Sequence, residues 1–561
     1  MDAAGSARPL PRGLRLYLAA LCVLAAAFVA TAPWRFGGRE IGRLAVLWGA
    51  LALLGGIALL RRDWRAPLLE RFRFREIRFR RAAVLGAGLL AAAFLLRIVV
   101  GRYVSLDLNA WDTTLSFDRP IASTLAGRLL LSPDTGTSSL GTHASYVLLA
   151  FVPLYFVAPT PLWLLAAVGL AISGAAVVAF LLFRRVLADD LPGAFLAAAF
   201  VLNTYTAKTV QYGFHVEVFY PLAVFLLFLG LLEERIALLA AGVLLAILVK
   251  EDSVLLLSGF AAFAAVTRRY RAAAAVVAAG IASYLVASRL VMPHFSGAAA
   301  EHPWYAVYWS SWGDSLPSIA LSMLRHPGRL AAAVGRSGVP RLLETLLFLP
   351  LAGPEGLGAA VPAILPFAAA DYRPLRELTL YYSMPVLPFL FVGAGFGMTR
   401  IASLVSRFRF PGPNRKPETR NQKPETRTTT RLLALAVCLI CALDGPGYTL
   451  TRPSPACGEI DPTLRIAGDA PVRIQGSLYP HAGYSPNRRA LDRRPLAADE
   501  AVLLAPDTNP YPFRASELSE LAARLSSNPR YRRVATPAGL LLFLPQVNRE
   551  THARSDAVVA R

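Results

Sequence analysis

Charged side chains are scarce in this chain: they make up 17% of its 561 residues, whereas 55% of the residues are hydrophobic. A soluble chain normally carries about 25% charged residues, so a series of soluble domains does not fit most of this sequence. Cysteine is also rare, because four cysteines do not make a disulfide framework. Cys438 and Cys441 lie inside an apolar block, and we interpret them as packing residues rather than metal ligands.

Long apolar blocks are abundant in the chain. They run for about 15–22 residues, close to the ~20 that cross the hydrocarbon core of a bilayer. The first block, Leu14 to Ala32, has Arg8, Arg12 and Arg15 around its start and lacks a small-residue cleavage site, so it is predicted to be a retained helix. The net charge of +22 then fits arginine-rich cytoplasmic loops, and nucleic acid is not expected as a partner.

The basic clusters predict the topology. Arginines crowd the stretch from Arg61 to Arg81, which puts this loop and the N-terminus in the cytoplasm and the loop 101–142 outside. The apolar stretch from His143 to Val157 is short and contains Pro153. Treating it as a re-entrant or interfacial helix puts the later basic clusters on the cytoplasmic side. We therefore predict a mainly α fold in a bacterial inner membrane, with about 13 transmembrane helices and the C-terminus outside.

The domain organisation follows from composition. The multi-spanning domain is predicted to cover residues 1–400, followed by a basic cytoplasmic linker at 401–431 in which the motif KPETR occurs twice. A last transmembrane helix is expected at 432–445. Residues 446–561 are predicted to form a small α/β domain on the outer face. Its expected elements are strands at Val472–Ile474, Ala501–Leu504 and Gly539–Leu544, and a helix at Ser516–Leu525.

Four polar clusters fall at the predicted outer ends of helices. Each has a simple structural explanation, because aspartates cap helices, short polar stretches form solvated turns, and Trp/Tyr loops often lie at the membrane interface. Ionisable groups at a membrane edge are nevertheless functional candidates, since burying them is costly. The clusters are the aspartate-containing segment 106–112, the segment 211–217, the turn Lys250-Glu251-Asp252 and the aromatic segment 293–312.

These clusters form part of a larger set of motifs between about Val100 and Phe513. The set comprises Asp107-Leu108-Asn109-Ala110-Trp111-Asp112, His143, Gly213-Phe214-His215-Val216-Glu217, Leu248-Val249-Lys250-Glu251-Asp252, Tyr381-Tyr382-Ser383-Met384-Pro385 and Tyr479-Pro480-His481. It resembles a bacterial and archaeal family of predicted membrane proteins, domain of unknown function 2079 (DUF2079). That family is similar in layout to the GT-C glycosyltransferases. The resemblance implies sugar transfer from a polyprenyl-phosphate carrier in the membrane to an acceptor on the outer face.

Such a transfer needs a base and a cation. A carboxylate takes the proton of the acceptor, and a positive charge stabilises the leaving phosphate. On this hypothesis Asp107 is the first candidate for the base and Asp112 the second. Lys250 or His215 would supply the cation, and Arg102 is a further candidate.

The remaining polar residues of the motifs have supporting roles in this hypothesis. Glu217, Glu251 and Asp252 would orient the reacting groups or hold a divalent metal with His215, and His143 completes the expected substrate-binding set. Two other classes stay open: a transporter or flippase for a lipid-linked or polar substrate, and a non-catalytic envelope scaffold. Many transporters contain internal repeats, and no clear repeat of the spans is evident here. The sugar and the acceptor are left unassigned.

Overall fold

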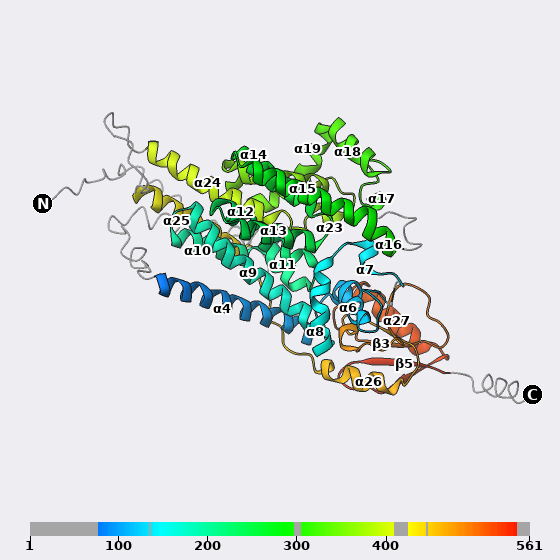
Figure 1. Ribbon diagram of the computed structural model, residues 1–561. Coiled ribbons are helices and arrows are strands. Elements are labelled where there is room, and N and C mark those ends of the chain that lie inside the picture. The colour runs from blue at the N-terminus through cyan, green and yellow to red at the C-terminus, as the bar shows by residue number, and fades with distance from the viewer. Residues whose placement is uncertain are drawn as a thin grey trace, which may run out of the picture.

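The computed structural model describes residues 77–132, 134, 136–296, 305–408, 424–444 and 447–546. In these ranges the chain is mainly helical, and a small sheet domain lies at one end of a helix bundle (Figure 1). The predicted first helix from Leu14 to Ala32 and most of the arginine cluster from Arg61 to Arg81 lie outside the described residues.

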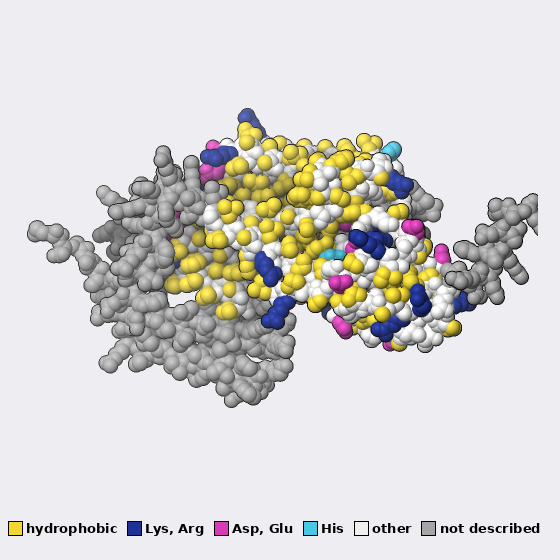
Figure 2. Space-filling model, turned by 90° about the horizontal axis from the view of Figure 1, so that it is seen from below, with side chains coloured by type: hydrophobic (Ala, Val, Ile, Leu, Met, Phe, Trp, Pro, Cys, Tyr) yellow, Lys and Arg dark blue, Asp and Glu magenta, His cyan; other side chains and the backbone are white. Residues whose placement is uncertain are grey.

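The bundle exposes large apolar side chains on its outside. Leu89 and Leu90 of α4 are 72% and 74% exposed, and Ile236 of α13 is 81% exposed. Figure 2 shows a broad hydrophobic surface over the helices, with most charged side chains at its margins and on the sheet domain. A surface of this kind fits contact with lipid. The longer helices are α4 (Ile77–Val104), α9 (Leu162–Val186), α10 (Asp190–Leu202), α12 (Tyr220–Leu232), α13 (Ile236–Val249), α14 (Ser253–Val266), α15 (Tyr270–Val286), α22 (Pro354–Ala368), α24 (Leu387–Phe408) and α25 (Pro424–Leu443).

The predicted count of about 13 spans is not confirmed. Among the described residues, five helical segments are long and apolar enough to cross a membrane, and further apolar helices are shorter. The five are Gly86–Val104, Leu162–Val186, Tyr270–Ser296, Leu387–Val405 and Thr426–Leu443. The shorter ones are Tyr146–Val157, Asp190–Leu202, Val216–Leu232, Ile236–Val249 and Ser253–Val266.

The stretch from His143 to Val157 is broken into two short helices. They are η2 (Tyr146–Phe151) and α8 (Val152–Val157), with Pro153 in the first turn of α8. Together they extend over roughly 20 Å, which is less than the ~30 Å of a hydrocarbon core. This length agrees with the interpretation as a re-entrant or interfacial segment, and its depth in a bilayer stays a prediction.

Short helices connect the long ones where the chain turns. Leu106, Leu378 and Leu380 have positive φ angles in these turns, a conformation that non-glycine residues rarely adopt. The short helices are α5 (Ala110–Asp112), η1 (Thr113–Asp118), α6 (Arg119–Thr124), α7 (Ser139–Thr142), α11 (Thr204–Tyr212), η3 (Val216–Phe219), η4 (Ala287–Val291), α16 (Met292–Ser296), α17 (Tyr305–Tyr308), α18 (Leu316–Arg325), α19 (Pro327–Gly335), α20 (Val339–Thr345), α21 (Leu349–Ala352) and α23 (Arg373–Arg376).

Helices α24 and α25 extend into the predicted linker at 401–431. Helix α24 ends at Phe408 and α25 begins at Pro424, so the linker is shorter than the composition indicated. The last helix therefore contains the predicted span 432–445 almost completely and adds two turns before it. The polar start of α25 explains the difference, because a hydropathy criterion does not detect a helical segment that is rich in threonine and arginine.

The C-terminal domain is α/β, as predicted. Its sheet has the order β2-β1-β3-β5-β4, with β1 parallel to β2 and β3, and β5 antiparallel to β3 and β4. The three predicted strands and the helix are confirmed within three residues, whereas β2 and β4, which are rich in arginine, were missed. The elements are η6 (Pro455–Glu459), α26 (Ile460–Ile466), β1 (Val472–Ile474), η7 (Tyr479–His481), β2 (Arg488–Ala490), β3 (Ala501–Leu504), α27 (Ala515–Ser527), β4 (Tyr531–Val534) and β5 (Leu541–Pro545).

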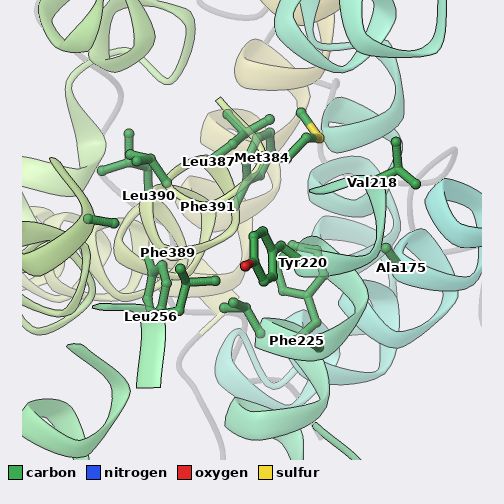
Figure 3. Packing of buried hydrophobic residues seen from close by; sticks show 14 of the residues in the cluster. Ala175, Val218, Tyr220, Phe225, Leu256, Met384, Leu387, Phe389, Leu390 and Phe391 are labelled. Atoms are coloured by element: carbon green, nitrogen blue, oxygen red, sulfur yellow. The ribbon is translucent and has the colours of Figure 1, made fainter. Parts of the chain in front are cut away.

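Aromatic rings and close helix contacts hold the bundle core together. The ring of Phe228 in α12 lies 5.2 Å from that of Phe260 in α14 and 5.8 Å from that of Phe389 in α24. Figure 3 shows neighbouring members of this cluster, all from buried apolar positions. Helices α14 and α22 come so close that a Cβ at Gly259 would lie 1.9 Å from the carbonyl oxygen of Ala359.

We expect Gly259→Ala to destabilise the protein by about 1–3 kcal/mol, because α14 and α22 must separate to admit the methyl group. Gly358→Ala is the matched control: it lies in α22 with nothing within 4 Å of the new Cβ, and should be neutral or stabilising by up to about 1 kcal/mol. Thermal unfolding in detergent measures both. Equal melting temperatures for the two variants would contradict the close helix contact.

Candidate functional site

Asp107 lies just beyond the C-terminal end of α4, directly after Leu106 with its positive φ angle. Its carboxylate oxygen Oδ2 is 3.1 Å from Nη1 of Arg102, and the Asp107 side chain is 47% exposed. Nη2 of Arg102 also donates to the backbone carbonyl of Asp107 at 2.8 Å. The last turn of α4 thus fixes a solvent-accessible carboxylate beside a guanidinium group.

Asp112 lies farther into the molecule, at the end of α5. The hydroxyl of Tyr212, the last residue of α11, donates a short hydrogen bond to it. Gly213 follows with a φ of 118°, and a Cβ there would lie 2.7 Å from Oγ1 of Thr113, so only glycine lets α11 end against the loop 101–142. This contact brings the two predicted motifs 106–112 and 211–217 together.

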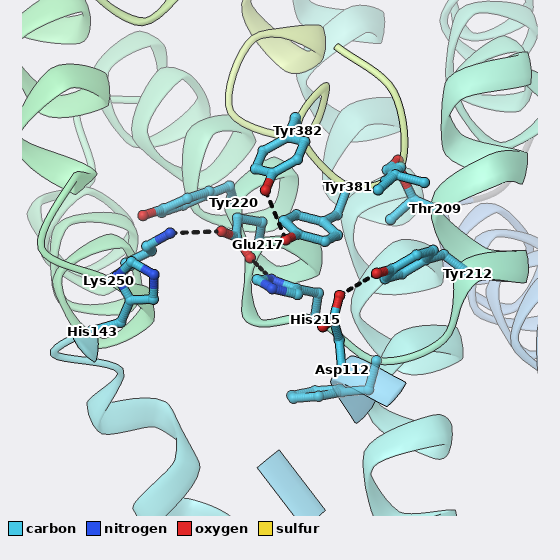
Figure 4. Close-up of polar contacts among 12 residues, drawn as sticks. Asp112, His143, Thr209, Tyr212, His215, Glu217, Tyr220, Lys250, Tyr381 and Tyr382 are labelled. Carbon is cyan, nitrogen blue, oxygen red and sulfur yellow. Dashed lines mark hydrogen bonds and ion pairs between the residues drawn. The ribbon is translucent and has the colours of Figure 1, made fainter. Parts of the chain in front are cut away.

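A buried network of charged side chains adjoins Tyr212. His215 is hydrogen-bonded to Glu217, whose other oxygen lies 3.2 Å from Nζ of Lys250. His215, Glu217 and Lys250 are each less than 10% exposed, and the His215 ring stacks on Tyr381 at 3.4 Å between centroids. Figure 4 shows these side chains converging from η3, from the turn between α13 and α14, and from the segment before α24. Burial of so many charges is tolerated only because each is paired.

The rest of the Lys250-Glu251-Asp252 turn extends this network in two directions. Asp252 lies 3.9 Å from Nζ of Lys250 and accepts a short hydrogen bond from Tyr220. Glu251 faces the other way: its Oε1 is 2.8 Å from Nδ1 of His143, and its Oε2 accepts from the backbone N–H of Ala144 at 2.9 Å. Glu251 therefore anchors the start of the segment 143–157 to the bundle.

The predicted site residues fall into two groups. One continuous arrangement contains Asp112, His215, Glu217, Lys250 and Asp252. Glu251 connects His143 to it. Arg102 and Asp107 form a separate pair at the protein surface.

Sequence reasoning missed the tyrosines that connect the first group. Tyr212, Tyr220, Tyr381 and Tyr382 line the network, and the hydroxyls of Tyr381 and Tyr382 are 3.0 Å apart. Tyrosine is common at membrane interfaces, so hydropathy gave no reason to select these four. Two signals were present in the sequence: Tyr212 lies in the polar segment 211–217, and the Tyr-Tyr-Ser-Met-Pro motif contains Tyr381 and Tyr382.

The expected metal-binding set is not assembled. Glu217, Glu251 and Asp252 have different partners, and the described part of the chain holds no group of three or more His, Cys, Asp or Glu side chains able to bind an ion. The aromatic segment 293–312 is only partly within the described residues. Of its members, Trp309 and Trp312 donate to backbone carbonyls at the end of α22, which is a structural role.

The C-terminal domain packs directly on the start of the loop 101–142. Leu106 is fully buried in the core of that domain, and Asn509 donates to the backbone carbonyl of Asp107 at 3.1 Å. The His481 ring stacks on Tyr103 at 4.0 Å between centroids, and burial lowers the pKa of His481 to about 4, so it is neutral at this contact. The domain therefore forms one side of the surroundings of Asp107.

Asp118 is a fully buried carboxylate at the same interface. It accepts hydrogen bonds of 2.7 Å from Tyr155 of α8 and from Tyr484 of the C-terminal domain. Burial raises the pKa of Asp118 to about 6, although the two tyrosines and the neighbouring Arg119 lower it. Arg119 lies 4.2 Å above the ring of Tyr479.

The apolar helices and their lipid-compatible surface define a multi-spanning membrane protein. Residues 102–439, more than half of the chain, match the model of the DUF2079 family of predicted membrane proteins, and the chain belongs to that family. The sequence-based assignment is thus confirmed, although the match ends well before Phe513. The chain is also similar to the crystal structure of ArnT from Cupriavidus metallidurans bound to undecaprenyl phosphate, with 13% identity, a TM-score of 0.47 and coverage of 83% of this chain and 98% of that one. No curated protein sequence matches significantly.

We expect Glu217→Gln to destabilise the protein by about 3–5 kcal/mol, because it leaves the buried ammonium of Lys250 without its main partner. The matched control is Glu234→Gln, which removes an exposed partner of Arg269 and should cost less than about 1 kcal/mol. Chemical unfolding in detergent measures both. Losses of the same size would show that Lys250 is not held by Glu217.

The stability of the protein should also depend on pH through Asp118. Its pKa is raised in the folded state, so its favourable contribution is present at low pH and is lost as pH rises through about 6. Between pH 5 and 7.5 the wild type should lose about 1.4 kcal/mol more stability than Asp118→Asn. Melting curves of both proteins across this pH range give the difference. Parallel pH profiles would exclude the buried, ionising carboxylate.

Proposed function

We propose that this protein is an integral-membrane glycosyltransferase of the GT-C type. It transfers a sugar from a polyprenyl-phosphate carrier to an acceptor on the outer face of a bacterial inner membrane. The N-terminus is cytoplasmic in this proposal and the C-terminal domain is extracytoplasmic. The observation that carries it is Asp107, a half-exposed carboxylate that is fixed by Arg102 and contacted by the C-terminal domain.

Asp107 acts as the base in the proposed reaction. The acceptor hydroxyl loses its proton to the Asp107 carboxylate while its oxygen forms a bond to the anomeric carbon of the sugar. The bond from that carbon to the phosphate oxygen breaks, and the lipid phosphate leaves with the electron pair. Asp112 is the second candidate for this role; its hydrogen bond to Tyr212 makes it the less accessible of the two.

The ion pair of Arg102 and Asp107 links the proton transfer to the leaving group. In the resting site the two charges compensate each other at 3.1 Å. Once Asp107 has taken the proton it is neutral, so the positive charge of Arg102 becomes available to the phosphate as negative charge develops on it. Lys250 and His215 are both paired with Glu217, which makes them better suited to orienting the lipid phosphate than to neutralising it.

Transport is the second candidate function, and the buried network is the observation that favours it. Paired ionisable residues inside a helical membrane protein often mark an ion or proton pathway. A flippase or permease would use the network of Lys250, Glu217 and Asp252 and would not need Asp107. Reconstituted vesicles separate the classes. Uptake of a labelled lipid-linked sugar without its transfer indicates transport. The absence of both uptake and transfer favours a scaffold.

We expect Asp107→Asn to lower the rate of sugar transfer by about 10²–10⁴-fold, the usual contribution of a general base. The assay follows a radiolabelled sugar from polyprenyl phosphate in purified protein. Asp314→Asn is the matched control, since it removes an exposed carboxylate outside the site, and it should retain full activity. Wild-type activity in Asp107→Asn, with loss in Asp112→Asn, would assign the base to Asp112.

A further inference from the structure

The C-terminal domain contains a cavity that the proposed reaction does not use. Its volume is about 840 Å³, and it lies between the segment after β2, helix α27 and the start of β4. That size is in the range of small-molecule sites. The side chains that matter for its chemistry are those of Arg493, Arg494, Arg524, Arg530, Phe513 and Tyr531.

Among the charged side chains of the cavity lining that form no ion pair with a described residue, positive charges outnumber negative ones. Arg493 is paired with Glu517 at 3.0 Å, and Arg494 is paired with Asp492. Arg524 and Arg530 have no ion pair with any residue that the structure describes, and Glu520 is the one remaining carboxylate of the lining. Guanidinium groups bind carboxylates and phosphates in a bidentate manner, so two of them in one cavity favour an anionic ligand.

The walls also offer apolar and hydroxyl-binding surface. The rings of Phe513 and Tyr531 line the cavity, with the guanidinium of Arg493 5.5 Å from the centroid of the Phe513 ring. Leu491 and Leu525, which are almost completely buried, add apolar surface to the lining. Saccharides present both C–H faces and many hydroxyls, and they combine well with aromatic rings next to charged planar groups. A purely apolar ligand would leave the guanidinium groups unpaired, which is costly.

The position of the cavity connects it to Asp107. Phe513 belongs to the same loop as Asn509, which donates to the backbone carbonyl of Asp107. Four residues of chain span at most about 14 Å, so the cavity wall lies within that distance of the Asn509 contact. An oligosaccharide held in the cavity can therefore extend toward the loop 101–142.

We propose that this cavity binds an anionic saccharide, that is, a glycan carrying carboxylate or phosphate groups. The assignment of this glycan as the acceptor rests on the proposed function. Its binding to the cavity is independent of that function. Arg524 and Arg530 hold the anionic groups, and Phe513 and Tyr531 contact the sugar rings.

The test uses the purified full chain in detergent with trigalacturonic acid as the probe and maltotriose as the uncharged comparison, by calorimetric titration. We expect saturable binding of trigalacturonic acid and much weaker binding of maltotriose. The double variant Arg524→Glu/Arg530→Glu should weaken binding at least 10-fold. The control is Arg532→Glu/Arg533→Glu, which changes the net charge of the protein by the same amount at exposed positions of β4 outside the cavity. Its dissociation constant for the probe should be within twofold of the wild-type value.

Three results would overturn the proposal: no saturable binding of the acidic probe, equal binding of maltotriose, or an equal loss in the two double variants. Melting temperatures of both variants, together with the milder pair Arg524→Gln/Arg530→Gln, distinguish lost binding from lost folding. Asp107→Asn should bind the probe like the wild type. If the wild type binds the probe but transfers no sugar, the binding site in the cavity is supported and only the proposed function is contradicted.

Discussion

The contact between Lys250 and Glu217 is the interaction on which the end of the bundle next to the C-terminal domain depends. An ammonium group in an apolar helical environment is costly unless an anion and hydrogen-bond acceptors surround it. Glu217 and Asp252 supply those charges, and each is in turn fixed by a side chain from a different element, His215 and Tyr220 respectively. Moving any one helix would leave a charge unpaired. The network therefore sets the relative positions of η3, α12, α13 and α14.

The loop 101–142 takes its shape from this arrangement and from the C-terminal domain. Thr113 of the loop contacts Gly213 and Phe214 directly before the network, so its inner side follows the bundle. Its outer side contributes Leu106 to the core of the C-terminal domain. Asp107 lies where these two sides meet. A carboxylate there is held by backbone contacts on both flanks and still reaches solvent, which suits a group that must meet a mobile acceptor.

Hydropathy and charge placement were sufficient to predict a helical membrane domain and a small α/β domain after it. The strands at Val472–Ile474 and Ala501–Leu504 were predictable because they are short apolar runs bounded by polar residues. Strands β2 and β4 were not, because arginine dominates them and their pairing depends on neighbours distant in sequence. Segments such as α12, α13 and α14 are shorter than a usual span, so block lengths alone did not yield the number of crossings.

The ionisable residues of the candidate site could be predicted from the sequence, but the side chains that each of them contacts could not. Lys250, Glu251 and Asp252 stand out in an apolar sequence because charge there is rare and costly. That Glu251 turns toward His143 while Asp252 turns toward Tyr220 depends on the direction of each side chain in a tight turn. No spacing rule gives that direction. The separation of Asp107 from the network has the same origin, since the positive φ angle at Leu106 is a property of the folded chain.

The hydrogen bond from Asn509 to Asp107 joins residues 402 positions apart, and this has a consequence for synthesis. At about 5–20 residues per second, roughly 20–80 s pass between the emergence of the two partners. During that interval the loop 101–142 has neither Asn509 nor the hydrophobic core into which Leu106 fits. The nascent chain must therefore leave Leu106 without that core until the last domain has been synthesised, which makes the end of translation the step that completes the site.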